Sequence, residues 1–172
     1  CELEKIAHVS YDMDLAGDVW PNRPSIRPSS IYPLHVDVTG ETTASKLSRV
    51  RSVMKDKNAD YHLITKLEDI AWLFNLRGRD VANTPVFFAF SLITQTRAFL
   101  YVMDESFTGE DVRPYFQIFE DVKTLHPGRI LLDDSVVSYA LIRSLPPDVE
   151  VIPGSNPTEL MKALKNETEI SC

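Results

Sequence analysis

The middle of the chain contains two strongly apolar runs, Val86–Ile93 and Ala98–Met103, which constrain the fold more than any other feature. Both are rich in β-branched and aromatic residues, and the polar stretch Thr94–Arg97 separates them, so the pattern predicts an antiparallel hairpin. Neither run alternates apolar with polar residues, as a strand with one face in water would. The hairpin is therefore expected at the centre of a sheet that helices cover on both faces.

Helical and extended patterns alternate around this hairpin. A helix is predicted from Thr42, with apolar residues on one face (Leu47, Val50, Val53, Met54) and charged residues facing away (Lys46, Arg49, Lys55, Asp56). A strand at 61–64 and a second short helix follow, in which Thr65 and Glu68 are expected to form a capping box. This helix is expected to end at Gly78, because glycine can take a positive φ.

The second half of the chain repeats the alternation. The pattern predicts weak helix at 110–119, strand at 129–132, helix at 135–144 and strand at 149–152. A last helix follows Asn156, which is expected to cap it, with Pro157 at its first position. The sequence therefore predicts an α/β fold with a mixed sheet of five or six strands and helices on both faces.

Prolines mark a boundary near the amino-terminal end. Four of them lie between Trp20 and Pro33, and each fixes φ and removes a backbone donor. We expect a tail of a preceding domain at residues 1–20, a proline-rich linker at 21–40 and the main domain at 41–166. Cys1 and Cys172 lie at the extreme ends, where they build no disulfide framework or C-x-x-C site, and ends of this kind suggest an excised piece.

Composition and charge exclude several classes of function. With 18 basic and 25 acidic residues, the formal charge is −7, so the chain lacks the positive charge that nucleic-acid binding needs. No apolar run approaches the roughly 18 residues of a membrane span, and the chain does not begin with a secretory signal pattern. We expect a cytoplasmic protein without nucleic-acid or membrane partners. The six glycines are too widely spaced for G-x-G-x-x-G, a Walker loop or a G-x-S-x-G elbow.

The candidate metal ligands and nucleophiles form no local signature. The four histidines (His8, His35, His62 and His126) lack an H-E-x-x-H motif, and His62 is expected to pack within its strand. One alternative is a ribonuclease H-like nuclease, in which acidic residues at strand ends hold two metals. The acids available for it are Asp69, Asp80, Asp104, Asp133 and Asp134. Asp133 and Asp134 are also expected to cap the next helix, and the negative charge disfavours a nuclease.

The least ordinary segment is residues 67–87, where an apolar helix breaks into a charged loop and re-enters a buried strand. The loop brings Arg77, Arg79, Asp80 and Asn83 to one edge of the sheet. Loops on rigid scaffolds often carry recognition. The alternative is an Arg77–Asp80 ion pair that only fastens a turn, and both interpretations stay open at this point.

This segment reads DIAWLFNLRGRDVANTPVF over residues 69–87 and closely resembles a signature of the three-domain Xaa-Pro aminopeptidases, in the creatinase and prolidase family. The resemblance extends over nearly the whole chain. Residues 18–24 (DVWPNRP) resemble the end of the family's first domain, and residues 46–51 (KLSRVR) resemble the opening helix of its second. Residues 138–140 (SYA) and 162–166 (KALKN) resemble that domain's last helices.

The resemblance implies a creatinase-type amino-terminal domain without catalytic activity of its own. The family's chemistry lies in a following metallopeptidase domain, which would begin after residue 172. There, two Asp, one His and two Glu hold two divalent metal ions, commonly manganese. The implied partners are this catalytic domain, the preceding amino-terminal domain and peptides with proline in second place, in a homodimeric parent.

The resemblance also suggests roles for particular residues. This domain is expected to wall the entrance of the active site and restrict access to it, with Arg77, Asp80 and Trp72 as candidate substrate-binding residues. Arg77 and Asp80 are expected to contact either substrate or a neighbouring domain, because a guanidinium pairs with carboxylates in a fixed geometry. Trp72 could offer an aromatic wall to a prolyl ring, although its helical position favours the core. Relatives often place Asn directly before the proline, whereas this chain has Thr84-Pro85, with Asn83 one place earlier.

The alternative function is a stand-alone dimerisation or protein-interaction module with no enzyme attached. The mass in solution discriminates between the two, because a self-associating module is dimeric on its own and a wall of a larger enzyme is largely monomeric.

Overall fold

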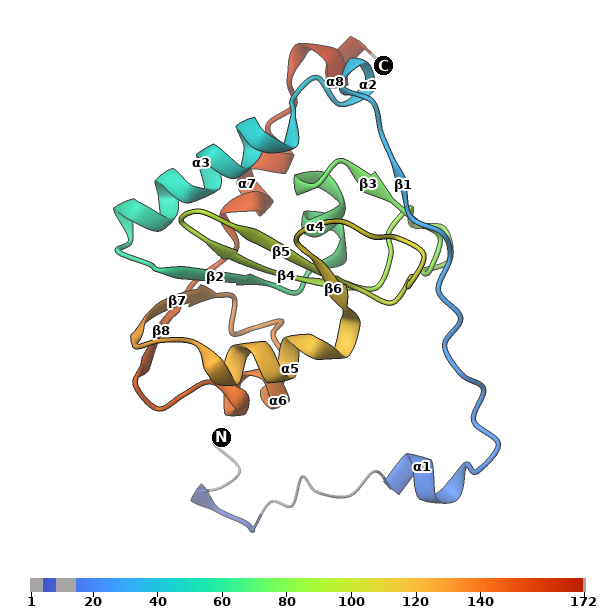
Figure 1. Cartoon of the computed structure of the whole chain (residues 1–172), viewed down its shortest axis with the longest axis vertical. Helices are drawn as coiled ribbons and strands as arrows, with labels where there is room; N and C mark the ends of the chain where they lie inside the picture. Colours follow the sequence, from blue (N-terminus) through green and yellow to red (C-terminus); the bar gives the residue numbers. More distant parts are fainter. Residues whose placement is uncertain (1–4, 9–14, 172) are drawn as a thin grey trace.

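The computed structural model describes residues 5–8 and 15–171, and Figure 1 shows their arrangement. Cys1, Cys172 and much of the segment predicted as a tail lie outside the described residues. Helix α1 (Leu15–Val19) stands apart from the folded layers, and the connector that follows it, residues 20–31, contains no helix or strand. Within the described part of the chain, no helix is both long enough and apolar enough to cross a membrane.

A six-stranded mixed sheet forms the centre of the domain, in the order β6-β5-β4-β2-β7-β8. Its strands are β2 (Tyr61–Ile64), β4 (Ala89–Thr94), β5 (Ala98–Val102), β6 (Val112–Pro114), β7 (Gly128–Leu132) and β8 (Val149–Pro153). Strands β4 and β5 form the predicted antiparallel hairpin, and β2 pairs antiparallel with β4. Strand β6 joins β5, β7 joins β2 and β8 joins β7, all in parallel. The predicted α/β class and strand number are confirmed.

Helices cover both faces of the sheet, as the apolar hairpin predicts (Figure 1). One layer contains α3 (Thr43–Asp56), α4 (Leu67–Leu73) and α7 (Pro157–Ala163). The other contains α5 (Ile118–Asp121) and α6 (Tyr139–Ser144), with the 3₁₀ turns η2 (Tyr115–Gln117) and η3 (Val122–Thr124). Each layer packs its own cluster of buried apolar side chains against the sheet. The core is therefore divided into two halves by the hairpin and β2.

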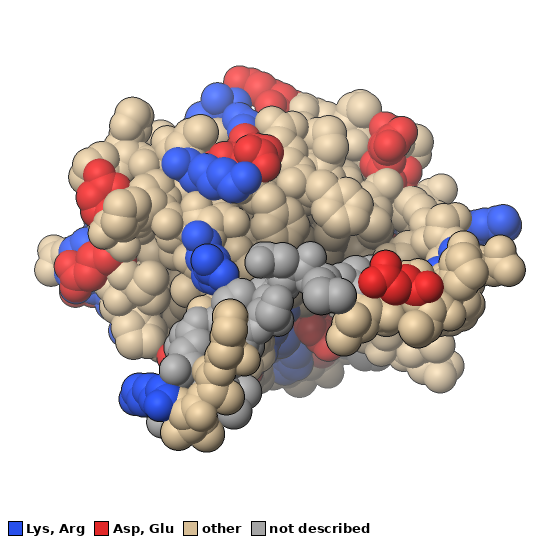
Figure 2. All heavy atoms as spheres, turned by 90° about the horizontal axis from the view of Figure 1, so that it is seen from below, with Lys and Arg blue, Asp and Glu red and all other residues tan. Residues whose placement is uncertain are grey.

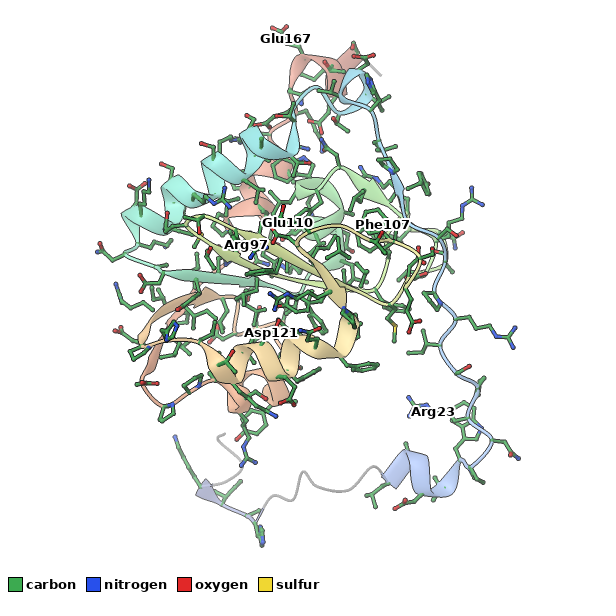
Figure 3. The ribbon with its side chains drawn as sticks, in the orientation of Figure 1. Arg23, Arg97, Phe107, Glu110, Asp121 and Glu167 are labelled. Carbon is green, nitrogen blue, oxygen red and sulfur yellow. The ribbon has the colours of Figure 1, made fainter. Side chains whose placement is uncertain are left out.

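The helix predicted at 110–119 is wrong. Residues Val112–Pro114 instead extend the edge of the sheet, where the missing amide of Pro114 is tolerated. Only the short turns η2 and α5 follow. Asp121 on α5 accepts a hydrogen bond from Tyr101 Oη on β5 at 2.7 Å and also pairs with Arg113, so it ties this layer to the sheet (Figure 3).

A two-stranded sheet, which the sequence patterns did not predict, joins β1 (Tyr32–Pro33) to β3 (Leu76–Arg77). It attaches the end of the connector to the segment after α4. The expected positive φ falls on Asn75 (54°) and not on Gly78. Gly78 is needed for a different reason, because a Cβ there would lie 2.7 Å from Cβ of Phe87. Helices α2 (Val36–Thr39) and α8 (Glu167–Ser171) pack together beyond this small sheet (Figure 1).

Two helix starts also differ from the prediction. The Thr65 capping box is wrong, because α4 begins after Lys66, which makes no side-chain cap. The predicted helix at 135–144 begins later, at Tyr139, with Ser138 as its cap. Asp133 instead caps the preceding turn, since its Oδ1 accepts hydrogen bonds from the amide and hydroxyl of Ser135.

Candidate functional site

The segment at 67–87 folds into α4, β3 and the loop that leads to β4. Trp72 and Arg77 from this segment line an open cavity of about 210 Å³. Helix α4, the loop and the carboxyl-terminal segment supply most of the other walls: Glu68, Thr84, Pro85, Lys162, Lys165 and Glu169. Asp80 is not among the lining residues. The structure therefore brings Trp72 and Arg77 together and places Asp80 elsewhere.

The guanidinium of Arg77 is half-buried and held from one side. Its Nη1 donates to the carbonyl oxygens of Ala71 at 2.9 Å and Leu76 at 2.8 Å. Burial lowers the pKa of Arg77, but arginine keeps its charge in proteins. Among the described residues, no carboxylate forms an ion pair with it and its Nε and Nη2 make no hydrogen bond. These donors suit a carbonyl or carboxylate group that enters the cavity.

Asp80 fastens the connector to the loop. Its Oδ1 accepts a hydrogen bond from the Ser29 amide at 2.6 Å, and its Oδ2 accepts one from the Phe88 amide at 2.7 Å. Both carboxylate oxygens are thus engaged by backbone donors. The alternative of an Arg77–Asp80 ion pair is wrong, since each side chain has other partners.

A second carboxylate holds the same stretch of connector. Asp104, just after β5, accepts a hydrogen bond from the Ile31 amide at 2.9 Å, and Ile31 itself is buried. The hydroxyl of Ser29 also accepts a hydrogen bond from the Arg79 amide at 2.7 Å. We call this arrangement, in which Asp80 and Asp104 bind the amides of Ser29 and Ile31, the connector clamp. It fixes where the chain enters the domain.

Trp72 is only 6% exposed, so most of its ring belongs to the core and one part reaches the cavity. Lys46 lies beneath it, with Nζ 4.3 Å from the ring centroid. The same Nζ donates to Trp72 O at 2.9 Å and to Asn75 Oδ1 at 2.7 Å. The prediction that Lys46 faces away from the core is wrong: it is 1% exposed, because these partners satisfy its ammonium group. Burial lowers the pKa of Lys46 to about 8.

Helix α7 is fastened beside the cavity by a buried carboxylate that the sequence patterns do not predict. Asp69 on α4 is 0% exposed, and its Oδ1 accepts a hydrogen bond from Lys162 Nζ at 2.6 Å. Its Oδ2 accepts hydrogen bonds from Thr158 Oγ1 at 3.1 Å and Asn156 Nδ2 at 3.3 Å. Asn156 occupies the N-cap position of α7 and Pro157 the first helical position, as expected, but the Asn156 side chain makes no capping hydrogen bond and binds Asp69 instead. The available signal was the position of Asp69 directly before the apolar run Ile70–Leu73, because a carboxylate buried with such a run requires a partner.

The acids of the nuclease alternative have separate structural roles. Asp69 binds α7, Asp80 and Asp104 form the connector clamp, and Asp133 caps a turn. Residues 5–8 and 15–171 contain no group of three His, Cys, Asp or Glu side chains that could hold a metal ion. These residues therefore do not assemble a two-metal centre.

Two of the histidines, His62 and His35, lie apart from the cavity of Arg77 and Trp72. His62 is fully buried in β2, as predicted, with Nδ1 2.9 Å from the carbonyl oxygen of Leu131. His35 is exposed and lies before α2, where its Nδ1 is 3.0 Å from Asp37 Oδ2. Neither residue lines the cavity of Arg77 and Trp72. That cavity offers charged donors and an aromatic wall, a combination that suits the binding of a polar group beside an apolar one.

The charged residues do not form one dominant patch on the face seen in Figure 2. Lys and Arg side chains are interspersed with Asp and Glu side chains there. The cavity itself is also mixed, because Arg77, Lys162 and Lys165 share it with Glu68 and Glu169. Recognition at this cavity therefore depends on the position of individual donors.

The chain belongs to a known domain family and is similar to curated proteins of one description. Residues 22–169 match the family model for the creatinase/prolidase N-terminal domain. A probable Xaa-Pro aminopeptidase P of Blastomyces gilchristii is 34% identical over 176 residues, covering 88% of this chain and 28% of that protein. A protein of the same description from Aspergillus fumigatus is 34% identical over 183 residues, covering 95% of this chain and 28% of that protein. The chain thus spans just over a quarter of the length of these relatives.

Solved structures share the fold at low sequence identity. The Xaa-Pro dipeptidase from Bacillus anthracis has a TM-score of 0.58 and 20% identity, covering 76% of this chain and 38% of that one. The prolidase from Pyrococcus horikoshii OT3 has a TM-score of 0.52 and 20% identity, covering 73% of this chain and 37% of that one. Each similarity covers about three quarters of the chain and shows the fold alone.

Proposed function

Since the chain belongs to the creatinase/prolidase N-terminal domain family, we propose that it is the non-catalytic domain of an Xaa-Pro aminopeptidase. Such an enzyme removes the amino-terminal residue that precedes a proline. The observation that carries this proposal is the 34% identity to probable Xaa-Pro aminopeptidases P over 88% of the chain. The sheet and helices of the same family support it independently.

The proposal assigns the chemistry to a part of the parent enzyme outside this chain. The described residues do not fit a metal centre, because they bring no three ligands together. Two divalent metal ions, with manganese as the expected metal, are therefore proposed only for the catalytic domain. The homodimeric parent belongs to the same proposal and rests on the resemblance alone. The cytoplasmic location is proposed from the sequence pattern, in which no secretory signal was recognised.

Within that enzyme, we assign the cavity of Arg77 and Trp72 to the wall of the active-site entrance. Arg77 presents Nε and Nη2 to an arriving peptide, whose carbonyl or terminal carboxylate would accept the hydrogen bonds. Trp72 supplies the apolar floor beside it. Asp80 is proposed to act between domains, because the connector clamp sets the path of the chain toward the preceding segment.

We expect Arg77→Ala in the full-length enzyme to lower kcat/KM for Xaa-Pro peptides about tenfold, since a hydrogen bond to a charged group contributes about 1.5 kcal/mol or more. Steady-state kinetics with a short Xaa-Pro peptide series would measure this loss. The matched control is Arg79→Ala, because Arg79 is exposed two residues away and its side chain does not line the cavity. Equal effects of the two substitutions would contradict a specific role of Arg77.

The alternative of a stand-alone module makes a different prediction for the parent. If the full-length parent does not hydrolyse Xaa-Pro peptides in the presence of manganese, the proposed function is wrong. Sedimentation of this chain by itself then decides whether it self-associates.

A further inference from the structure

Helix α7 has one face that the domain does not cover. Leu160 on α7 and Leu164, the residue that ends it, are 69% and 67% exposed, although Thr158 is buried and Met161 packs on the core. They border an open cavity of about 660 Å³ between α7 and α3, together with Val53, Pro157, Met161 and Ala163. We call this surface the α7 groove. Its lining is mainly apolar, with Lys57 and Glu159 as the charged contributors.

The α7 groove is rigidly supported from behind. The buried Asp69 carboxylate binds three side chains near or on α7, and Lys66 Nζ pairs with Glu159 Oε1 at 2.6 Å. Thr158 is fully buried, and Met161 packs on the core cluster. A preorganised apolar surface loses little conformational entropy when it is covered. Contiguous exposed apolar surface of this kind marks an interaction site.

The length and position of the matching region indicate what covers this surface. The chain corresponds to 28% of the relatives, so most of such a polypeptide lies outside it. The family match ends at residue 169, only a few residues beyond α7. A segment that continues from there is tethered beside the groove, which gives it a high effective concentration at this surface.

We propose that the α7 groove is the docking surface for the polypeptide that follows this domain in the parent enzyme, with Leu160 and Leu164 as its anchors. This inference rests on the proposed function. An apolar groove held by buried polar contacts suits a permanent partner within one chain better than a transient charged ligand.

A partner docked in the α7 groove would also lie at a fixed position relative to the cavity of Arg77, because α7 borders both. Leu160, Met161, Ala163 and Leu164 line the groove, whereas Lys162 and Lys165 of the same segment line the cavity of Arg77. Helix α7 thus separates the two surfaces. A partner seated in the groove would have its distance from Arg77 set by one rigid helix, which Asp69 fastens to α4.

Hydrogen exchange read by mass spectrometry tests this proposal in the full-length parent. We expect amides of residues 157–164 to exchange at least tenfold more slowly in the parent than in this chain alone. The double variant L160D/L164D should remove that additional protection in the parent. In this chain alone, the same variant should keep its Tm, because both side chains are exposed.

A matched control uses another exposed apolar side chain. Phe116 is 66% exposed and lies in the other layer, so Phe116→Asp should leave protection at α7 unchanged. Equal protection of residues 157–164 in the parent and in this chain would overturn the docking proposal. Protection that instead rises with the concentration of this chain alone would assign the groove to a second copy and would also overturn it.

The docking proposal and the proposed function can fail independently of each other. A parent that cleaves Xaa-Pro peptides while α7 exchanges freely retains the proposed function and loses the docking surface. A parent with protected α7 but without Xaa-Pro peptidase activity retains the docking surface and loses the proposed function.

Discussion

Replacing Asp69 with alanine is expected to lower the free energy of unfolding by about 3 kcal/mol, the cost of breaking a buried ion pair. Asp69 is fully buried and binds Lys162, Thr158 and Asn156. Without the carboxylate, the hydroxyl and amide donors remain buried without their acceptor, and the Lys162 ammonium loses its counter-charge. Urea denaturation of this chain at neutral pH, followed by circular dichroism, would measure the change.

The control for this substitution is Asp134→Ala. Asp134 is exposed, so its removal should change the free energy of unfolding by less than about 0.5 kcal/mol. If Asp69→Ala lowers the free energy of unfolding no more than Asp134→Ala does, the Asp69 carboxylate does not hold α7. The hydrogen-exchange protection of α7 in the Asp69→Ala chain provides a second measure of the same contact.

The stability of the wild-type chain is expected to fall by about 3 kcal/mol between roughly pH 7 and pH 4 through His62 alone. Burial lowers the pKa of His62 from 6.5 to about 4. Over that range the unfolded chain binds a proton at this residue and the folded chain does not, so acid favours unfolding. The structure supplies the reason, because the ring is fully buried and its Nε2 has no hydrogen-bond partner to stabilise a charge.

Carboxylates also titrate toward pH 4, so the effect of His62 is measured as the difference in stability between the wild-type chain and a variant without this histidine. His62→Leu replaces the imidazole with an apolar side chain of similar volume and so removes the titrating group. Chemical denaturation of both chains at several pH values should show the wild type losing about 3 kcal/mol more than the variant toward pH 4. Parallel curves for the two chains would mean that His62 is protonated in the folded state.

The sequence patterns predicted the sheet better than its connections. The hairpin of β4 and β5 was predictable because two long apolar runs with a polar break allow few other structures. Strand β6 was not predictable, because its three residues, which end in Pro114, are too few to show a periodicity. They form a strand because β5 offers an open edge, along which Leu100 pairs with Val112. The pairing of β1 with β3 likewise depends on a contact between distant segments.

The candidate site was predictable in part. The resemblance singled out Trp72, Arg77 and Asp80, and the structure places the first two at one cavity. The burial of Lys46 and Asp69 could not be predicted from helical periodicity, because a charged residue is assigned to the solvent face unless its partner is known. Those partners, Asn75 and Lys162, lie 29 and 93 residues away along the chain. Roles for Trp72, Arg77 and Asp80 in substrate binding stay predictions.

Both edges of the central sheet end in proline. Pro114 closes β6 and Pro153 closes β8, so each open edge is short and lacks one amide donor. Edge strands of this kind are poor templates for strand addition by another molecule. The domain is therefore protected against edge-to-edge aggregation, and copies of it that do associate must use their helices and loops instead.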